Sequence, residues 1–189
     1  MIMDKRTGVL DLLANIEPAN KQEKKSIQEI KKLISSHKNI FERECLEAHL
    51  TASALVVNPQ TKMFLLHLHK KLKMWLQFGG HADGETDLAA VALKESTEET
   101  GLKDLEFFSN KKVPLDIDLQ IIPKYKEVAE HYHLDFRYLL FTQAIKVPTP
   151  DADESQKLRF FSLKELEQIK NKLDPALIRL AKKARKLIH

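Results

Sequence analysis

The order of hydrophobic patterns along the 189 residues predicts an α/β fold, in which helices cover both faces of a mixed sheet. Two helical patterns come first, strand patterns interrupted by one helix follow, and further helical patterns end the chain. Hydrophobic residues make up 43% of the chain and charged residues 31%, which is typical of a globular protein and argues against disorder. A chain of this length is expected to form one domain with a substantial core.

The first two helical patterns cover residues 5–16 and 21–36. An Asn-x-x-Glu capping box precedes the second pattern, whose isoleucines and leucine repeat on one helical face. Because the pattern changes near Thr51, we expect residues 1–48 to form an N-terminal helical extension packed on a domain of residues 49–189. The extension could also act as a lid or a dimerisation arm, so a homodimer is one expected assembly.

The predicted strands are apolar, β-prone runs bounded by turn residues. They cover residues 51–58, 62–69, 75–78, 105–122, 132–145 and 157–161. The first two should form a hairpin, because Asn58-Pro59-Gln60-Thr61 between them is a turn signal. His67 and His69, two residues apart in the second run, are interpreted as ordinary residues of a polar strand face.

Three more helices follow from capping signals. The helix at 87–100 has an apolar side and ends at Gly101. Ser162 begins a capping box for the next helix, and Asp174-Pro175 opens the last one. The last helix is amphipathic, and we expect its basic side to face solvent.

Four of the five glycines fall within one short part of the chain, at Gly79, Gly80, Gly84 and Gly101. A sequence so sparing with glycine places it where the backbone needs a positive φ or approaches a ligand closely. We therefore expect the functional site in this segment.

The helix in that segment carries Glu95, Glu98 and Glu99, which share one helical face because they stand at i, i+3 and i+4. Carboxylates so close repel one another unless a cation binds there. Oxygen ligands without cysteine suit Mg²⁺ or Mn²⁺, which can acidify an attacking water and neutralise a diphosphate. The alternative interpretation is a solvated acidic helix face.

The segment 80–102 resembles the signature of the Nudix hydrolases, which is Gly, five residues, Glu, seven residues and Arg-Glu-apolar-x-Glu-Glu-x-Gly-apolar. The matching residues are Gly80, Glu95, Glu98, Glu99, Gly101 and Leu102. Three residues depart from the signature, namely Thr86 for its first glutamate, Lys94 for its arginine and Ser96 for an apolar residue. Glu85 or Asp83 could partly replace the missing glutamate. The resemblance covers about residues 49–170.

The resemblance implies an α/β/α sandwich around a mixed sheet. It also implies Mg²⁺- or Mn²⁺-dependent hydrolysis of the pyrophosphate of a nucleoside diphosphate linked to another group. Glu95, Glu98 and Glu99 would be the metal ligands, with Glu98 and Glu99 at the catalytic centre. In several Nudix members a carboxylate in the loop before the last strand activates water, which makes Glu154 the first candidate for this base and Asp153 the second.

Two further stretches resemble one Nudix subgroup, namely Trp75-Leu76-Gln77-Phe78-Gly79-Gly80-His81 and His131-Tyr132-His133-Leu134-Asp135-Phe136-Arg137. The residues expected to bind substrate are Gly80, His81, His131, His133 and Asp135. The last three alternate along a predicted strand and point to one face. They would form a polar wall that binds a cation or a substrate phosphate, with Asp135 orienting an imidazole. The alternative is an edge strand whose polar face lies in water.

The composition limits the kinds of binding partner that we expect. The net charge of +4 is too small to indicate stable nucleic-acid binding, and no apolar run reaches the roughly 20 residues of a membrane helix. The single Cys45 excludes an internal disulfide and a cysteine-based zinc site, which suits the cytoplasm. We therefore expect a small nucleotide-type diphosphate as the partner, without a membrane.

Two other functions compete with hydrolysis. One is a non-catalytic Nudix-like regulator that binds a nucleotide, against which the intact glutamate set argues. The other is an isomerase of the same fold that acts on an isoprenoid diphosphate through a catalytic cysteine. Cys45 lies before the core and outside any such motif, which argues against the isomerase.

Overall fold

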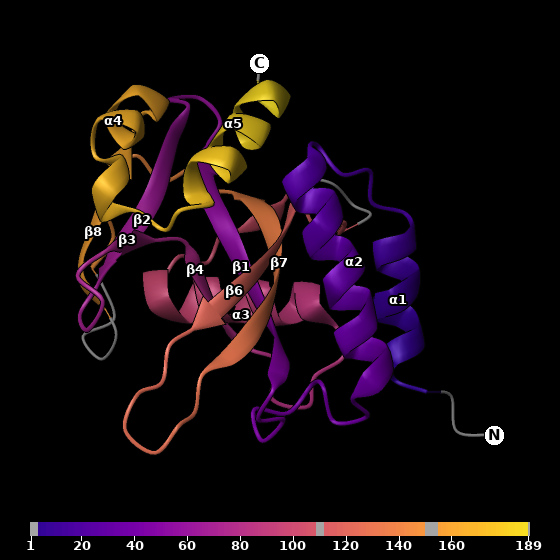
Figure 1. Cartoon of the computed structure of the whole chain (residues 1–189). Coiled ribbons are helices and arrows are strands. Elements are labelled where there is room, and N and C mark those ends of the chain that lie inside the picture. Colours follow the sequence, from indigo (N-terminus) through magenta and orange to yellow (C-terminus); the bar gives the residue numbers. More distant parts are fainter. Residues whose placement is uncertain (1–3, 109–111, 150–154, 189) are drawn as a thin grey trace.

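The computed structural model describes residues 4–108, 112–149 and 155–188, and these form a mixed sheet with helices on both faces (Figure 1). The helices are α1 (Arg6–Ala14), α2 (Lys21–Ser36), α3 (Leu88–Thr100), α4 (Leu163–Gln168) and α5 (Leu177–Leu187). The strands are β1 (Ala48–Asn58), β2 (Met63–His69), β3 (Trp75–Leu76), β4 (Phe78–His81), β5 (Glu106–Phe107), β6 (Asp116–Ile122), β7 (His131–Phe141) and β8 (Ser155–Phe161). The predicted α/β sandwich is confirmed.

The central strand β1 has different neighbours along its two edges. It runs parallel to β7 over its whole length, from Ala48 opposite Tyr132 to Val57 opposite Phe141. On its other edge it pairs with β2 only at residues 56–58, and β4 replaces β2 at residues 51–54. The predicted hairpin is therefore present but splayed, and β4 lies in the opening.

Gly79 allows β4 to lie this close to β1. A Cβ at Gly79 would come within 2.5 Å of Ala52 O and of the Ser53 Cα and Cβ. No side chain fits at that distance, which explains why the strand predicted at 75–78 continues into a glycine pair. The predicted strand is also divided, because Gln77 separates β3 from β4.

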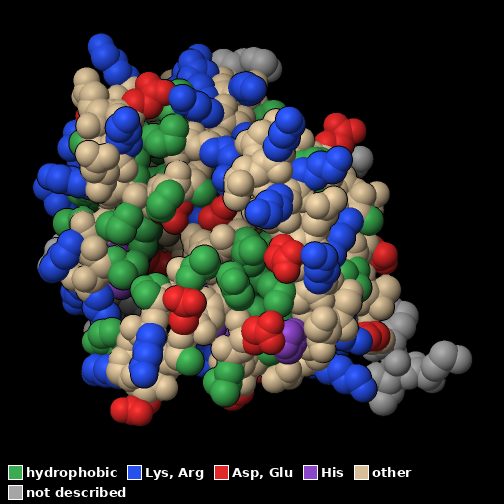
Figure 2. Space-filling view, viewed as in Figure 1, with side chains coloured by type: hydrophobic (Ala, Val, Ile, Leu, Met, Phe, Trp, Pro, Cys, Tyr) green, Lys and Arg blue, Asp and Glu red, His purple; other side chains and the backbone are tan. Residues whose placement is uncertain are grey.

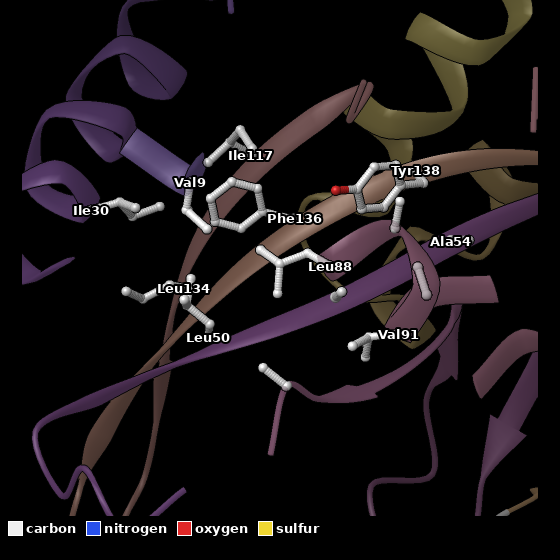
Figure 3. Packing of buried hydrophobic residues seen from close by; sticks show 14 of the residues in the cluster. Val9, Ile30, Leu50, Ala54, Leu88, Val91, Ile117, Leu134, Phe136 and Tyr138 are labelled. Carbon is white, nitrogen blue, oxygen red and sulfur yellow. The ribbon is translucent and has the colours of Figure 1, made fainter. Parts of the chain in front are cut away.

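One face of the sheet packs on α1, α2 and α3 (Figure 3). Alternate residues of the two central strands point to this side, as the period of two requires. The labelled contacts in Figure 3 are Leu50, Ala54, Leu134, Phe136 and Tyr138 from β1 and β7, Ile117 from β6, and Val9, Ile30, Leu88 and Val91 from the helices. Each fully buried large apolar side chain contributes about 1.5–3 kcal/mol.

The opposite face is divided into an apolar and a polar part. Helices α4 and α5 cover its apolar end, where they pack on Leu55 and Val57 of β1 and on Leu139 of β7. Nearer the start of both strands the same face carries histidines, hydroxyls and charged residues. This polar part is described with the site below.

The N-terminal helices share their core with the sheet. Val9 and Leu13 of α1 and Ile30 and Ile34 of α2 belong to the same hydrophobic cluster as the central strands. Glu23 of α2 is fully buried, where it accepts a hydrogen bond from Ile117 N. The helical extension is thus fastened to the sheet at β6.

The last helix differs from the expectation that its basic side faces solvent. Arg179 donates to Asp116 and Asp118 of β6, at 2.6 and 2.9 Å. Lys183 pairs with Asp116 and with Glu23 of α2. Acidic residues of β6 and α2, far away in the sequence, turn these two basic side chains toward the protein.

Two predicted strands differ from the observed ones, one because it is divided and one because it ends earlier. Residues 105–122 hold β5 and β6 as separate strands, with residues 109–111 outside the described ranges. The strand predicted at 132–145 ends at Phe141, because Asp104 accepts hydrogen bonds from Thr142 Oγ1 and Gln143 N. No helix of the described residues is long and apolar enough to cross a membrane.

Candidate active site

The glycine-rich loop leads from β4 into α3, and a capping residue fixes each end of this helix. The Asp87 carboxylate accepts the Ala90 N–H at 3.0 Å and caps the first turn. Gly101, with a φ of 69°, ends the helix in the left-handed conformation. The helix that carries the three glutamates therefore begins and ends where the sequence predicts.

The loop residues near the missing signature glutamate have other partners. Glu85 Oε1 accepts the backbone N–H groups of Thr86 and Asp87. Asp83 pairs with Arg43, which lies before β1, and Gly84 N donates to Phe41 O at 3.0 Å. The segment before β1 thus takes part in holding this loop.

Glu99 is the most deeply buried of the three glutamates. Its side chain is 7% exposed, and its Oε1 accepts the Gly79 N–H at 3.0 Å. Its Oε2 lies 3.1 Å from His67 Nδ1. Two neighbouring strands, β4 and β2, therefore fix the direction of this carboxylate.

Glu95 lies against Gly80. A Cβ at Gly80 would be 2.7 Å from Glu95 Cδ and 2.8 Å from its Oε2, so any other residue would take the space of this carboxylate. Glu98, one turn on, is exposed. Carboxylate oxygens from one helix face, held over a glycine, fit a hard divalent cation such as Mg²⁺ or Mn²⁺. The metal-ligand role of the three glutamates stays a prediction.

His67 is a residue that sequence reasoning missed. It was interpreted as part of a polar strand face, but its side chain is 4% exposed and it contacts Glu99. Burial lowers the pKa of His67 to about 4, so its imidazole is neutral at pH 7. The available signal was a histidine inside an otherwise apolar strand.

Four histidines gather on the sheet face opposite α3. His49 lies on β1, His81 on β4, and His131 and His133 on β7. The ring centroid of His49 is 5.0, 4.9 and 4.8 Å from those of His81, His131 and His133, respectively. The structure therefore joins three of the predicted substrate-binding residues with His49, which the sequence analysis did not single out.

These imidazoles are largely withdrawn from water. Burial lowers the pKa of His81 to about 4 and that of His133 to about 3, and it also lowers the pKa of His49. The imidazoles of His49, His81 and His133 are therefore mainly neutral at pH 7. On this side of the molecule the surface is hollowed, with acidic side chains in the depth of the hollow and hydrophobic ones around it (Figure 2).

Asp135 lies on the same strand face but has different partners from those expected. It accepts hydrogen bonds from Thr51 Oγ1, Ser53 Oγ and Arg137 Nε, at 3.1, 2.9 and 2.8 Å. The hydrogen bonds of His49 and His131 to the main chain go to carbonyl groups instead. Asp135 therefore supports the buried Arg137 rather than orienting an imidazole.

The interpretation of this strand as a solvated edge is wrong. Strand β7 pairs with β1 on one side and with β6 on the other. His131 and Asp135 are 8% and 4% exposed, and Arg137 is fully buried. The polar side chains of β7 thus lie inside the molecule, in the middle of the sheet.

Gly80 and the predicted water-activating base are not part of the histidine cluster. Gly80 faces α3, so it lies on the other side of β4 from the histidine rings. Glu154 and Asp153, the two candidates for a water-activating base, lie outside the described residues. The substrate-binding roles of Gly80, His81, His131, His133 and Asp135 stay predictions.

Comparisons with known proteins agree in one family. A family model described as the NUDIX domain matches residues 47–182. A protein of Lactococcus lactis subsp. cremoris (strain MG1363), named "Probable DHNTP pyrophosphohydrolase", is 34% identical over 164 residues, which cover 84% of this chain and 90% of that protein.

Solved structures share the fold. A Nudix-family hydrolase from Clostridium perfringens matches with a TM-score of 0.59 and 24% identity, covering 75% of this chain and 98% of that one. The dihydroneopterin triphosphate pyrophosphohydrolase of E. coli matches with a TM-score of 0.54 and 10% identity, covering 71% and 92%. At these identities the likeness concerns the fold.

Proposed function

Because this chain belongs to the Nudix hydrolase family, we propose that it hydrolyses the pyrophosphate bond of a nucleoside diphosphate linked to another group, in a reaction that depends on Mg²⁺ or Mn²⁺. The observation that carries the proposal is the arrangement of α3 over β4. Glu99 is anchored by Gly79 N, and Glu95 occupies the space that Gly80 leaves. A larger residue would clash at both glycines, with strand β1 at Gly79 and with the Glu95 carboxylate at Gly80.

The proposal gives each of the site's glutamates a role. Glu95, Glu98 and Glu99 would hold the cation, which when bound acidifies the attacking water and neutralises charge on the diphosphate. Glu99 is fixed in direction by β4 and by His67, so its carboxylate needs little reordering on binding. Glu98 is exposed, so a substrate in solution can reach it. Glu154 is proposed to accept the proton of the attacking water.

The first substrate to test comes from the relative. The Lactococcus protein is named a probable DHNTP pyrophosphohydrolase, so dihydroneopterin triphosphate belongs in the panel beside nucleoside triphosphates, nucleotide sugars, ADP-ribose and dinucleoside polyphosphates. The proposal includes a cytoplasmic location, which suits a chain whose only cysteine, Cys45, is free and buried.

The test is Glu98→Gln, measured as phosphate or pyrophosphate release over this panel with Mg²⁺ or Mn²⁺. We expect turnover to fall at least a hundredfold, or about 2.7 kcal/mol, because one anionic ligand is lost. Thermal stability should stay level or rise, because like-charge repulsion on α3 is relieved. The matched control is Glu29→Gln, an exposed glutamate of α2, which should keep full activity.

Two outcomes would contradict the proposal. Hydrolysis by Glu98→Gln at the wild-type rate would remove the metal-ligand assignment. Binding of the panel compounds by the wild-type protein, without turnover at any Mg²⁺ or Mn²⁺ concentration, would instead indicate the nucleotide-binding regulator.

A further inference from the structure

The division of roles proposed above gives no catalytic step to the four histidines on the far side of β4. Their backbones come from three strands, because the parallel register places His49 beside His133 and the β4 register places Thr51 beside His81. Three strands thus direct imidazoles toward one point. Four histidines packed together inside a protein need a physical reason.

The main chain fixes the proton of two of these rings. His49 Nδ1 lies 3.3 Å from Cys45 O, and His131 Nδ1 lies 2.9 Å from Ala129 O. A carbonyl oxygen only accepts, so each Nδ1 must carry the hydrogen. A ring held in this way has its lone pair at Nε2 when it is not protonated there. Backbone carbonyls that fix imidazole tautomers in this way are the usual second layer around a metal site.

The Nε2 atoms of two of these rings lie next to each other. His131 Nε2 lies 3.3 Å from His133 Nε2. Tetrahedral coordination with bonds of about 2.0–2.1 Å separates two nitrogen ligands by roughly 3.3–3.4 Å, so this spacing is that of two ligands of one ion. His49 Nε2 is buried and has no hydrogen-bond partner among the described residues. A buried acceptor left in this state is unfavourable, and a bound cation would offset that cost.

We propose that His49, His131 and His133 form a site for a divalent transition-metal ion of the Zn²⁺ class, separate from the glutamates of α3. The three residues each offer one ligand atom, and these atoms all lie within 4.8 Å of one another. Three neutral imidazoles favour Zn²⁺, Cu²⁺, Ni²⁺ or Fe²⁺ over Mg²⁺, which prefers oxygen. The site thus differs in chemistry from the carboxylate site.

His81 lies beside the open side of this site. Its ring centroid is 5.0 Å from those of His49 and His133, and it follows Gly80 directly in the chain. His81 is therefore the neighbouring side chain that could supply a fourth ligand after a side-chain rotation. An ion here would tie the start of β1 and β7 to the glycine loop.

The experiment uses the tag-free, full-length protein after removal of metal with a chelator. Co²⁺ is added as a spectroscopic probe, and Zn²⁺ is then added in competition. We expect one equivalent of Co²⁺ to bind with the visible absorption of a low-coordinate nitrogen site, and Zn²⁺ to displace it. His49→Gln and His133→Gln should each weaken Co²⁺ binding at least a hundredfold.

Two control variants separate this site from the others. His37→Gln removes a histidine that pairs with Glu47 outside the cluster, and it should bind Co²⁺ as the wild type does. Glu98→Gln, which tests the proposed hydrolysis, should also keep this Co²⁺ spectrum. A loss of the spectrum in Glu98→Gln, or affinities of both cluster variants within threefold of wild type, would overturn the histidine site and leave the hydrolase proposal untouched.

A wild-type measurement covers the case in which a cluster variant does not fold. Zn²⁺ at a hundredfold excess over its Kd should raise the Tm of the wild-type protein by roughly 5–10 °C. Long-range ¹H–¹⁵N spectra should show three imidazole Nε2 signals shifting with saturation at one equivalent. Zn²⁺ that leaves both the Tm and the imidazole signals unchanged would overturn the proposal.

Discussion

At the scale of single residues, Glu99 is held in position by groups that are already present without ligand. Gly79 N donates to one of its oxygens, and His67 Nδ1 lies 3.1 Å from the other. Both side chains are buried, so the interaction is little screened by water. His67 is therefore a positioning residue for the proposed cation site.

We predict that His67→Ala lowers kcat about tenfold, or about 1.4 kcal/mol, and leaves KM nearly unchanged. The Mg²⁺ concentration for half-maximal rate should rise as well, because Glu99 loses the group that directs it. His67→Asn, which returns a polar side chain to this position, should recover part of this rate. An unchanged Mg²⁺ dependence in His67→Ala would show that the contact only fills space.

The adjacent glycines Gly79 and Gly80 give a matched pair. A Cβ at Gly80 meets the flexible end of Glu95, whereas a Cβ at Gly79 meets the backbone of β1. We predict that Gly80→Ala folds but loses most activity, because the Glu95 carboxylate must move. Gly79→Ala should instead lose about 1–3 kcal/mol or more of unfolding free energy. Urea unfolding and turnover of both variants check this, and equal effects on stability would contradict it.

At the scale of elements, the sequence predicts best what local signals determine. Helix α2 has the predicted bounds, and α3 begins after Asp87 and ends at Gly101 as expected, because caps are local hydrogen bonds. The end of β7 was missed, because the residue that stops it, Asp104, lies 38 positions before Thr142. Partners so distant in sequence leave no periodic signal.

The candidate site also has one part that local sequence signals predict and another that they do not. The three glutamates share a helix face, and their spacing alone predicts this. The histidine cluster depends on the parallel pairing of β1 with β7, which sets His49 beside His133. Alternation along β7 predicts that His131, His133 and Asp135 face one side, but not that Asp135 turns to Arg137 and the β1 hydroxyls. Register between distant strands decides these contacts.

Asp104 offers a test at this scale. Its two carboxylate oxygens share the single hydroxyl proton of Thr142 Oγ1, at 2.9 and 3.0 Å, and one of them accepts the Gln143 N–H at 2.7 Å. Asp104→Ala should therefore lower the unfolding free energy by about 2 kcal/mol, as expected for hydrogen bonds to a charged group. Asp104→Asn should lose less, because one amide oxygen still accepts. A loss below 0.5 kcal/mol in Asp104→Ala, measured by urea unfolding, would mean that the end of β7 does not depend on it.

At the scale of the whole molecule, a network of ion pairs connects the N-terminal helix α2 and the last helix α5 to strand β6 of the sheet. Lys183 of α5 pairs with Glu23 of α2 and with Asp116 of β6. Arg179 adds hydrogen bonds to Asp116 at 2.6 and 2.9 Å. The N-terminal helices, the sheet and the last helix are therefore coupled through one fully buried carboxylate.

This carboxylate makes the stability of the molecule sensitive to acid. Burial raises the pKa of Asp116, but hydrogen bonds from Arg179 and Lys183 lower it more, so it lies below its ordinary value. A carboxyl whose folded pKa lies below its unfolded pKa binds fewer protons in the folded state. Its contribution to stability is therefore fully present above the unfolded value of about 4 and is lost as the pH falls through the folded pKa.

We predict that Asp116→Asn lowers the unfolding free energy at pH 7 by about 3 kcal/mol or more, because it leaves Arg179 and Lys183 without their shared buried partner. The difference between wild type and variant should then shrink as the pH falls below about 4 and through the lower folded pKa of Asp116, where the folded wild-type carboxylate is neutralised as well. Urea unfolding at pH 7, 5, 4 and 3 measures this difference directly. Asp11→Asn, an exposed acid of α1, is the control and should follow the wild-type curve at every pH. A difference that stays constant from pH 7 to 3 would show that the charge of Asp116 does not hold the three parts together.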